Sequence, residues 1–246
     1  MSEAQILLGV TPDWNRRQVA GRNAAQDSVA ATQMKEGVDA RIEKIGVIPA
    51  VRLDSSEDAL FVAEALAEAG VPVVEISMAG LGALDVISRL AQQASGMIVG
   101  AGGLFNTDAA GQCLDAGAKF LTSDIFVPGI VELAAKQSIT VIPGALTPAE
   151  IMTAWNAGAN FVKVTPCDAM GGHSYVRSLR AALPQVRLVA AGGVNQLTAL
   201  SFIKAGAAAL SAGNELIPEE AIWLRQTRRI QELARRFRNA VDAGRA

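Results

Sequence analysis

The sequence predicts an α/β fold in which eight parallel strands, each followed by a helix, close into a (βα)8 barrel. From residue 45 onward, eight short apolar runs alternate with segments of helical length. Near-continuous apolar strands between helices are typical of a parallel sheet covered by helices. An open doubly wound sheet also alternates in this way, but no GxGxxG turn follows the first run. The count of eight units therefore favours the barrel.

The eight runs are the expected strands. They read, in order, GVIPAV, VPVVEIS, GMIVGAG, KFLTS, TVIPG, NFVKVTP, VRLVAAGG and AAALSAG. An Ala-Gly pair precedes the second, fourth, sixth and eighth of them, with Gly70, Gly117, Gly158 and Gly206 as the glycines. A glycine just past a helix end supplies the left-handed conformation that ends the helix, so each pair predicts a junction between a helix and a strand. The repeat suggests that the chain is built from two-strand units.

The first part of the chain differs in composition from the rest. Residues 1–42 are polar and alanine-rich and are expected to form an N-terminal extension that is partly disordered or helical, with a helix near Ala25–Glu43. The barrel is expected to occupy residues 43–246. The start of the chain has no basic segment followed by a long apolar one, so no secretory signal is predicted. Cys113 and Cys167 form no CxxC pair, and a reducing cytoplasm is the expected location.

Composition excludes several classes of function. The net charge of −2 gives no electrostatic case for nucleic acid or acidic membranes, and no apolar stretch is long enough to span a membrane. The basic C-terminal segment RRIQELARRFRNAVDAGR is interpreted as a solvated helix face. A single histidine, His173, cannot build a multi-histidine site, so neither a metal nor another cofactor is expected.

Two charged residues interrupt the apolar strands and carry the predicted chemistry. Glu75 lies within the second run and Lys163 within the sixth. If the alternation of each strand points them inward, a carboxylate and an amine meet in one cavity. Burial disfavours the charged form of an amine, and a neutral lysine can attack a ketone to form a Schiff base, with Glu75 as general acid and base. The alternatives are a structural ion pair between the two, or a lysine that extends to the barrel mouth.

Residues at other strand ends are candidates for binding substrate. Arg52 ends the first strand and could pair with an acid group. Loops after the seventh and eighth strands of (βα)8 barrels often bind phosphate, although glycines there could equally serve tight turns. Cys167 and His173 are interpreted as bystanders. The predicted substrate-binding residues are Arg52, Gly102, Gly103, Thr165, Gly192, Gly193, Gly213 and Asn214.

The motifs VVEISMAG, IVGAGGLFN, AGAKFLTSDIF, VIPGALTPAE, FVKVTPCDAMGG, VAAGGVN and SAGNELI occur in an order that resembles the KHG/KDPG aldolase family. The resemblance covers roughly residues 43–235. It implies a (βα)8 barrel, usually a homotrimer, that cleaves a 2-keto-4-hydroxy acid to pyruvate and an aldehyde. The Schiff-base lysine of that family matches Lys163, and its acid/base glutamate matches Glu75.

This sequence departs from the family pattern where the substrate is held. The resemblance places Ala79 and Gly103 where the family has an arginine and a threonine that hold the pyruvate carboxylate. Asp124, Thr165, Ala191 and Asn214 replace a proline, an aromatic residue, a threonine and a serine of the family. Arg52 matches an arginine of many relatives. Either Arg52 and the backbone at Gly102–Gly103 hold the carboxylate, or the substrate differs, for example in being an unphosphorylated hydroxylated aldehyde.

Three functions therefore remain open from the sequence. The leading one is a metal-independent aldolase acting on a keto acid through a Schiff base. The second keeps the Schiff base but dehydrates or decarboxylates the keto acid. The third is a non-catalytic relative that binds a metabolite, suggested by the number of changed ligands.

Overall fold

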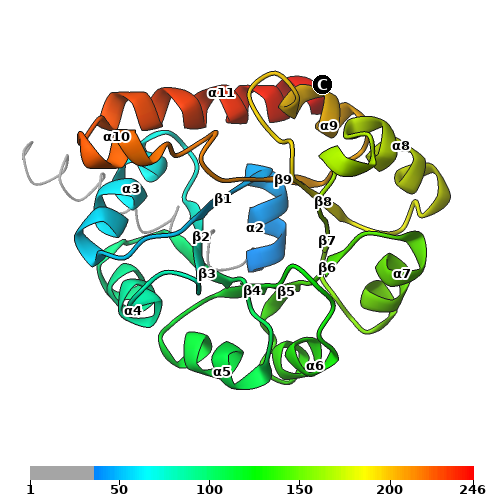
Figure 1. The fold of residues 1–246 in the computed structure, drawn as a ribbon, viewed down its shortest axis with the longest axis horizontal. Coiled ribbons are helices and arrows are strands. Elements are labelled where there is room, and N and C mark those ends of the chain that lie inside the picture. Colours follow the sequence, from blue (N-terminus) through cyan, green and yellow to red (C-terminus); the bar gives the residue numbers. More distant parts are fainter. Residues whose placement is uncertain (1–35) are drawn as a thin grey trace, which may run out of the picture. The chain divides into compact units, whose positions relative to one another are not determined.

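The computed structural model describes residues 36–246, and within them Val38–Ala246 form one compact unit. Nine strands pair in parallel in the order β5-β4-β3-β2-β1-β9-β8-β7-β6. β5 and β6 are two halves of one barrel strand, separated by Pro143. The N–H of Lys163 donates to the carbonyl of Pro143 at 2.8 Å, which continues the pairing across this break. The predicted (βα)8 barrel is thus confirmed, and Figure 1 views the ring of strands nearly end-on.

All eight predicted strands form. Their bounds are β1 Val47–Val51, β2 Val73–Ser77, β3 Ile98–Gly102, β4 Phe120–Thr122, β5 Thr140–Ile142 with β6 Gly144–Ala145, β7 Val162–Val164, β8 Leu188–Ala191 and β9 Ala209–Ala212. The helices are α2 Val38–Ile45, α3 Ser56–Glu68, α4 Ala83–Gln93, α5 Thr107–Asp115, α6 Pro128–Lys136, α7 Pro148–Asn156, α8 His173–Ala182, α9 Ala199–Lys204, α10 Glu219–Trp223 and α11 Thr227–Arg245.

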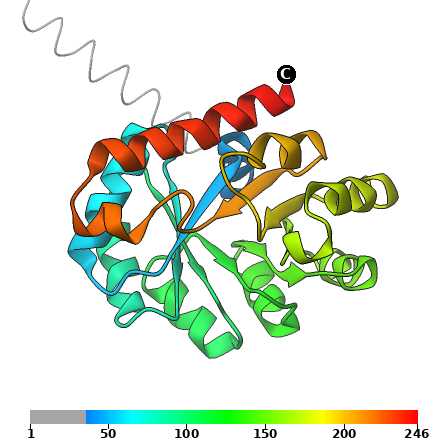
Figure 2. The same ribbon diagram turned by 45° about the horizontal axis from the view of Figure 1, so that its top comes forward.

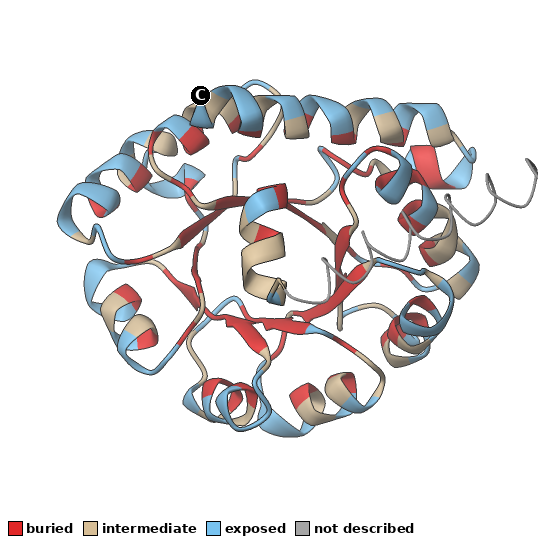
Figure 3. Ribbon diagram, turned by 180° about the vertical axis from the view of Figure 1, so that it is seen from behind, coloured by how far each residue is buried: buried red, intermediate tan, exposed pale blue. Residues whose placement is uncertain are grey.

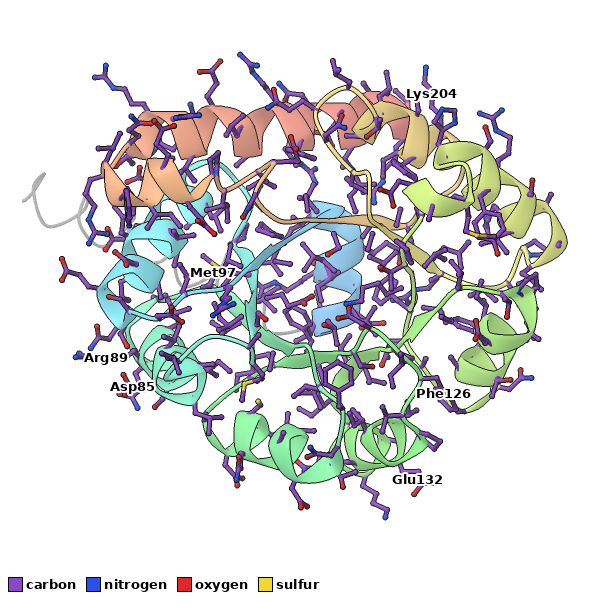
Figure 4. All side chains as sticks on the ribbon, viewed as in Figure 1. Asp85, Arg89, Met97, Phe126, Glu132 and Lys204 are labelled. Carbon is purple, nitrogen blue, oxygen red and sulfur yellow. The ribbon has the colours of Figure 1, made fainter. Side chains whose placement is uncertain are left out.

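The strands are buried on both faces, as a parallel sheet inside a helical ring requires. Figure 3 shows the strands as a continuous buried ring and the helices with an exposed outer side. Charged side chains such as Asp85 and Arg89 of α4, Glu132 of α6 and Lys204 of α9 lie on that outer side (Figure 4). Glu75 and Lys163 differ from these, since both are buried within strands.

The Ala-Gly pairs mark the junctions that they predict. Gly70, Gly117, Gly158 and Gly206 have φ angles of +80°, +106°, +101° and +100° and follow α3, α5, α7 and α9. Each helix therefore ends in the left-handed conformation that glycine adopts without strain.

Helix α2 crosses the N-terminal end of the barrel, opposite the end where the strands finish (Figure 3). It buries Ile42 and Ile45, and Asp39 pairs with Arg187 at 3.1 Å. The helix begins at Val38 and ends at Ile45, so it spans the predicted division between residues 42 and 43. The rest of the predicted extension, residues 1–35, lies outside the described residues.

The basic segment at the C-terminus forms α11, which packs against α3 and α9 on the outside of the barrel (Figure 2). The helix buries Ile230, Ala234, Phe237 and Val241. Its arginines pair with neighbouring carboxylates, for example Arg229 with Glu220 at 2.9 Å. These pairs fit the prediction of a solvated helix face. None of the helices described here is long and apolar enough to cross a membrane.

Helix α7, which leads into the strand that carries Lys163, begins with a capping box. The Thr147 hydroxyl accepts from the N–H of Glu150, and the Glu150 carboxylate accepts from the N–H of Thr147 at 2.8 Å. Backbone hydrogen bonds from Thr147 and Leu146 lower the pKa of Glu150. The favourable contribution of this carboxylate is therefore present at neutral pH and is lost on acidification below about pH 4.

Replacing Thr147 by alanine is expected to lower the free energy of unfolding by about 1 kcal/mol, because an N–H at the helix start loses its acceptor. Urea unfolding monitored by circular dichroism measures this. Thr153→Ala in the same helix is the matched control. Its hydroxyl bonds back to the carbonyl of Ala149 within the helix, so its loss should cost little. Equal losses from the two variants would contradict the assignment of the cap.

Candidate active site

Lys163 points into the barrel from the middle of β7. Its neighbours Val162 and Val164 are fully buried, and Lys163 is itself only 4% exposed. All three residues of β7 are buried, as expected for a strand covered on both faces. A buried ammonium without a partner is very costly, so the question is what compensates Lys163.

The compensating group is Asp124, a residue that the sequence marked only as a departure from the family pattern. The Nζ of Lys163 donates to Oδ1 of Asp124 at 2.7 Å. The lysine side chain is 5% exposed and the aspartate side chain 57%, so the pair runs from the barrel interior to its mouth. The predicted alternative of an ion pair between Lys163 and Glu75 is therefore not the arrangement found.

The loop after β4 is built to bring Asp124 to the lysine. The Ser123 hydroxyl is buried and donates to the carbonyl of Ile125 at 2.7 Å, which fixes the turn. Gly144 pairs in register with Lys163 on the neighbouring strand. A Cβ on Gly144 would come within 2.3 Å of the Asp124 backbone. Only glycine at this position lets the loop lie over β6 and reach Lys163.

Glu75 projects inward from β2 and is 6% exposed. Its carboxylate lies directly against Gly102 of β3, where a Cβ would come within 1.9 Å of Oε1. Gly102, predicted to bind substrate, is thus the position that makes room for Glu75. Oε2 of Glu75 is buried and has no hydrogen-bond partner. A buried carboxylate oxygen without a donor is unusual and is typical of a site that a ligand or water completes.

The two candidate catalytic residues make their contacts at neighbouring strands of the sheet. Glu75 crosses from β2 over β3, while Lys163 reaches from β7 past β6 to the loop that follows β4. β3 and β4 are neighbours in the sheet order. On β4, the Thr122 hydroxyl is also buried without a hydrogen-bond partner. The buried strands therefore carry an amine on β7, a carboxylate on β2 and a hydroxyl on β4.

A cavity of about 410 Å³ opens beside Asp124 at the C-terminal ends of β4 and β6. Asp124 and Thr165, the latter a predicted substrate-binding residue, both line it. Phe126, labelled in Figure 4, lies on the same loop as Asp124 and also borders the cavity. A small organic acid fits a cavity of this size.

Arg52 is exposed just after β1 and makes no hydrogen bond or ion pair within residues 36–246. Ala79 is exposed and offers no side-chain donor, and Gly103 takes a left-handed φ of +69° beside Ser77. The role of Arg52 and of the Gly102–Gly103 backbone in holding a carboxylate stays a prediction.

The glycine turn after β8 lies against an acidic side chain. Gly192 and Gly193 both have positive φ angles. A Cβ on Gly192 would lie 3.0 Å from Oδ1 of Asp168, and a Cβ on Gly193 would lie 2.6 Å from the Cβ of Asp168. Gly213 follows β9, and Asn214 is exposed beside it. Asp168 gives the first of these turns a negative neighbour, which sequence reasoning missed because Asp168 comes from a different loop.

His173 and Cys167, the two residues interpreted as bystanders, both make contacts within the fold. His173 begins α8 and packs against Phe202 in a T-shaped arrangement, with the ring centroids 6.2 Å apart. Cys167 is fully buried, and its Sγ donates to the carbonyl of Val164. Among the described residues, no three His, Cys, Asp or Glu side chains are grouped so that they could hold a metal ion.

Neither thiol is expected to react in the folded protein. Burial raises the pKa of Cys113 to about 11, and burial followed by the charge of Asp168 raises that of Cys167 to about 11. Because the thiolate is the reactive form, titration with a disulfide reagent at pH 8 should give no rapid reaction until denaturant is added. The two cysteines should then both react. A fast-reacting thiol in the native protein would contradict the burial of these residues.

Comparison with known proteins gives the family. The family model for KDPG and KHG aldolase matches residues 38–233. The KHG/KDPG aldolase of Escherichia coli K12 is 29% identical over 189 residues, which is 77% of this chain and 89% of that protein. The 2-dehydro-3-deoxy-phosphogluconate aldolase of Treponema pallidum is 29% identical and covers 74% of this chain and 86% of its own length.

A solved structure supports the same assignment. KDPG aldolase from Legionella pneumophila, with pyruvate captured as a covalent carbinolamine intermediate, superposes with a TM-score of 0.76 at 28% identity. The match covers 82% of this chain and 98% of that one. With the barrel, the inward lysine and the matched model in agreement, this chain belongs to the KDPG and KHG aldolase family.

Proposed function

We propose that this protein is a Schiff-base aldolase that cleaves a 2-keto-4-hydroxy acid to pyruvate and an aldehyde, with Lys163 as the nucleophile. The single observation that carries the proposal is the buried amine of Lys163 within barrel strand β7, paired with Asp124, which lines an open cavity at the C-terminal ends of the strands. (βα)8 enzymes place their catalytic groups at this end. Membership of an aldolase family supports the same reaction class.

The chemistry follows from the positions of the two buried groups. The neutral amine of Lys163 attacks the keto carbon, and loss of water leaves an iminium that withdraws electrons from the adjacent C3–C4 bond. A base removes the proton from the C4 hydroxyl, the C3–C4 bond breaks, and its electron pair moves into an enamine while the aldehyde leaves. Protonation at C3 and hydrolysis return pyruvate and the free amine. Glu75, whose Oε2 lacks a partner, is the proposed carrier of these protons through a bound water.

We further propose that the distal end of the substrate is uncharged and hydroxylated rather than phosphorylated. A phosphate at Gly192–Gly193 would lie beside the Asp168 carboxylate, and one near the lysine would lie beside Asp124. Like charges this close disfavour binding. Thr165 and Asn214 supply neutral groups that can bond to hydroxyls, and Arg52 is the proposed partner of the substrate carboxylate.

The test is to measure release of pyruvate from matched pairs of 2-keto-4-hydroxy acids with and without a terminal phosphate. We expect cleavage of both classes, with a kcat/KM at least about tenfold higher for the unphosphorylated member, since one unfavourable charge contact of about 1.4 kcal/mol gives a factor of ten. A preference for the phosphorylated member would overturn the substrate assignment. Absence of pyruvate from every compound would overturn the aldolase proposal.

The resemblance also implies a homotrimer, and the sequence implies a cytoplasmic location; both are parts of the proposal. Light scattering on the purified protein should give three times the protomer mass of 25.6 kDa. A monomer mass at micromolar concentration would contradict the trimer.

A further inference from the structure

We propose that Asp124 is a second catalytic carboxylate, which takes the proton from Lys163 and returns it to the carbinolamine hydroxyl. The inference rests on the proposed function, since it needs Lys163 as the nucleophile. The inference assigns a role to an aspartate that is not part of the family pattern, because the family has a proline where this chain has Asp124.

The first step of the argument is contact with the reacting atom. Asp124 Oδ1 accepts directly from Nζ of Lys163 at 2.7 Å, which is the length of a charge-assisted hydrogen bond. Glu75 makes no hydrogen bond to Nζ, and its carboxylate is held against Gly102 instead. Asp124 is thus the carboxylate positioned to exchange a proton with the nitrogen.

The second step is access to the substrate. The buried end of the pair is the amine, whereas the Asp124 side chain is 57% exposed and lines the cavity. A ketone that comes from the cavity to Nζ has to pass Asp124, so its oxygen would develop next to this carboxylate. The residue that takes the amine proton can therefore also reach the oxygen that must leave as water.

The third step is the proton balance. The resting pair is an ammonium and a carboxylate, one proton transfer away from an amine and a carboxylic acid. The amine adds to the keto carbon, a proton passes from nitrogen to the new alkoxide, and Asp124 then protonates the hydroxyl. The C–O bond breaks, water leaves, and the products are the iminium and the Asp124 carboxylate. One ammonium and one ketone give one iminium and one water, with no other reactant.

This arrangement divides the work between two carboxylates. Asp124 transfers protons to and from the nitrogen and the oxygen at C2, and Glu75 transfers the protons needed to break the C3–C4 bond. The glycine at position 144 and the buried Ser123 hydroxyl serve to position Asp124, since they set the path of its loop.

The test compares the rate at which borohydride traps pyruvate on the enzyme in three variants. Asp124→Asn keeps an acceptor for the Nζ hydrogen bond but cannot take a proton, and we expect trapping to slow by about 10²-fold with little change in half-saturation by pyruvate. Asp124→Ala should be equally slow, and added formate should restore at least a tenth of the original rate because the site is open to solvent. Glu132→Gln removes one charge from the outer side of α6, away from this cavity (Figure 4), and should trap within threefold of the unsubstituted protein.

The outcomes separate the two proposals. Trapping by the unsubstituted protein supports the proposed function whatever the variants do. If Asp124→Asn then traps within threefold of it, or formate fails to rescue Asp124→Ala, Asp124 has only a positioning role and this inference is wrong. If the unsubstituted protein traps no keto acid, the proposed function fails and the inference falls with it. Circular dichroism and thermal unfolding of each variant check that the fold is kept.

Discussion

Replacing Lys163 by methionine is expected to abolish pyruvate trapping and to lower aldol cleavage by about 10⁴-fold or more, because Lys163 is the one lysine among residues 36–246 that is buried within a strand. The fold should survive. Lys163 is buried among apolar strands, and methionine fills a similar volume without a charge to compensate. Asp124 would lose its ion-pair partner, but its side chain is largely exposed and can be hydrated instead.

Steady-state release of pyruvate, with thermal unfolding as the control, measures this effect. An exposed lysine provides a matched control: Lys204→Met on α9 removes the same charge at the outer surface (Figure 4) and should leave kcat and KM unchanged. Substantial cleavage by Lys163→Met, within tenfold of the original, would show that the reaction proceeds without a Schiff base at this residue.

Replacing Glu75 by glutamine is expected to lower kcat for cleavage by about 10²–10⁴-fold, the range for loss of a general acid and base. Glutamine has the same shape, so it should keep its place over Gly102, where nothing larger than hydrogen fits on the glycine. Since Asp124 is the proposed proton carrier for imine formation, Glu75→Gln should still be trapped with pyruvate at a rate within tenfold of the original.

Two measurements distinguish this role from a structural one. Cleavage is followed through pyruvate release, and the C3 step alone is followed through exchange of the pyruvate methyl protons with deuterium oxide. In Glu75→Gln we expect the rate of pyruvate release and the rate of methyl exchange to fall together, while borohydride still traps pyruvate on the enzyme. Normal methyl exchange in this variant would place the proton carrier for the C3–C4 step on another residue.

Much of the fold could be predicted from the sequence because its signals are local. The apolar runs and the Ala-Gly pairs act within a few residues, and each one marks a strand or a helix end in the structure. The split of the fifth strand at Pro143 was not predicted, because the apolar run TVIPG continues through it. Proline lacks the N–H that a continuous ladder needs at that point.

The site was predictable in part for the same reason. Strand alternation alone predicted that Glu75 and Lys163 lie inside the barrel, and both residues are buried. The Lys163–Asp124 pair was not predictable, because it joins residues 39 positions apart and depends on a glycine in a third segment. The signal that could have found it was present: a buried amine needs an anionic partner, and Asp124 replaces a residue that cannot provide one.

The position of Asp168 beside the glycine turn could not be predicted either, because it also depends on packing between distant segments. The turn read by itself suggests an anion site, and only the packing of the loop after β7 against the loop after β8 places a carboxylate there. The charge of a cavity depends on contacts between distant loops, whereas the backbone conformation of a turn depends on its own residues.

The central claim is that the amine of Lys163 becomes covalently bonded to the keto carbon of the substrate. The most direct measurement is reduction with borohydride in the presence of pyruvate, followed by mass mapping of the peptides. We expect a single adduct of reduced pyruvate on the peptide that contains Lys163, and none when borohydride or pyruvate is left out. An adduct confined to a different lysine, or no adduct with pyruvate and several longer keto acids, would contradict the claim.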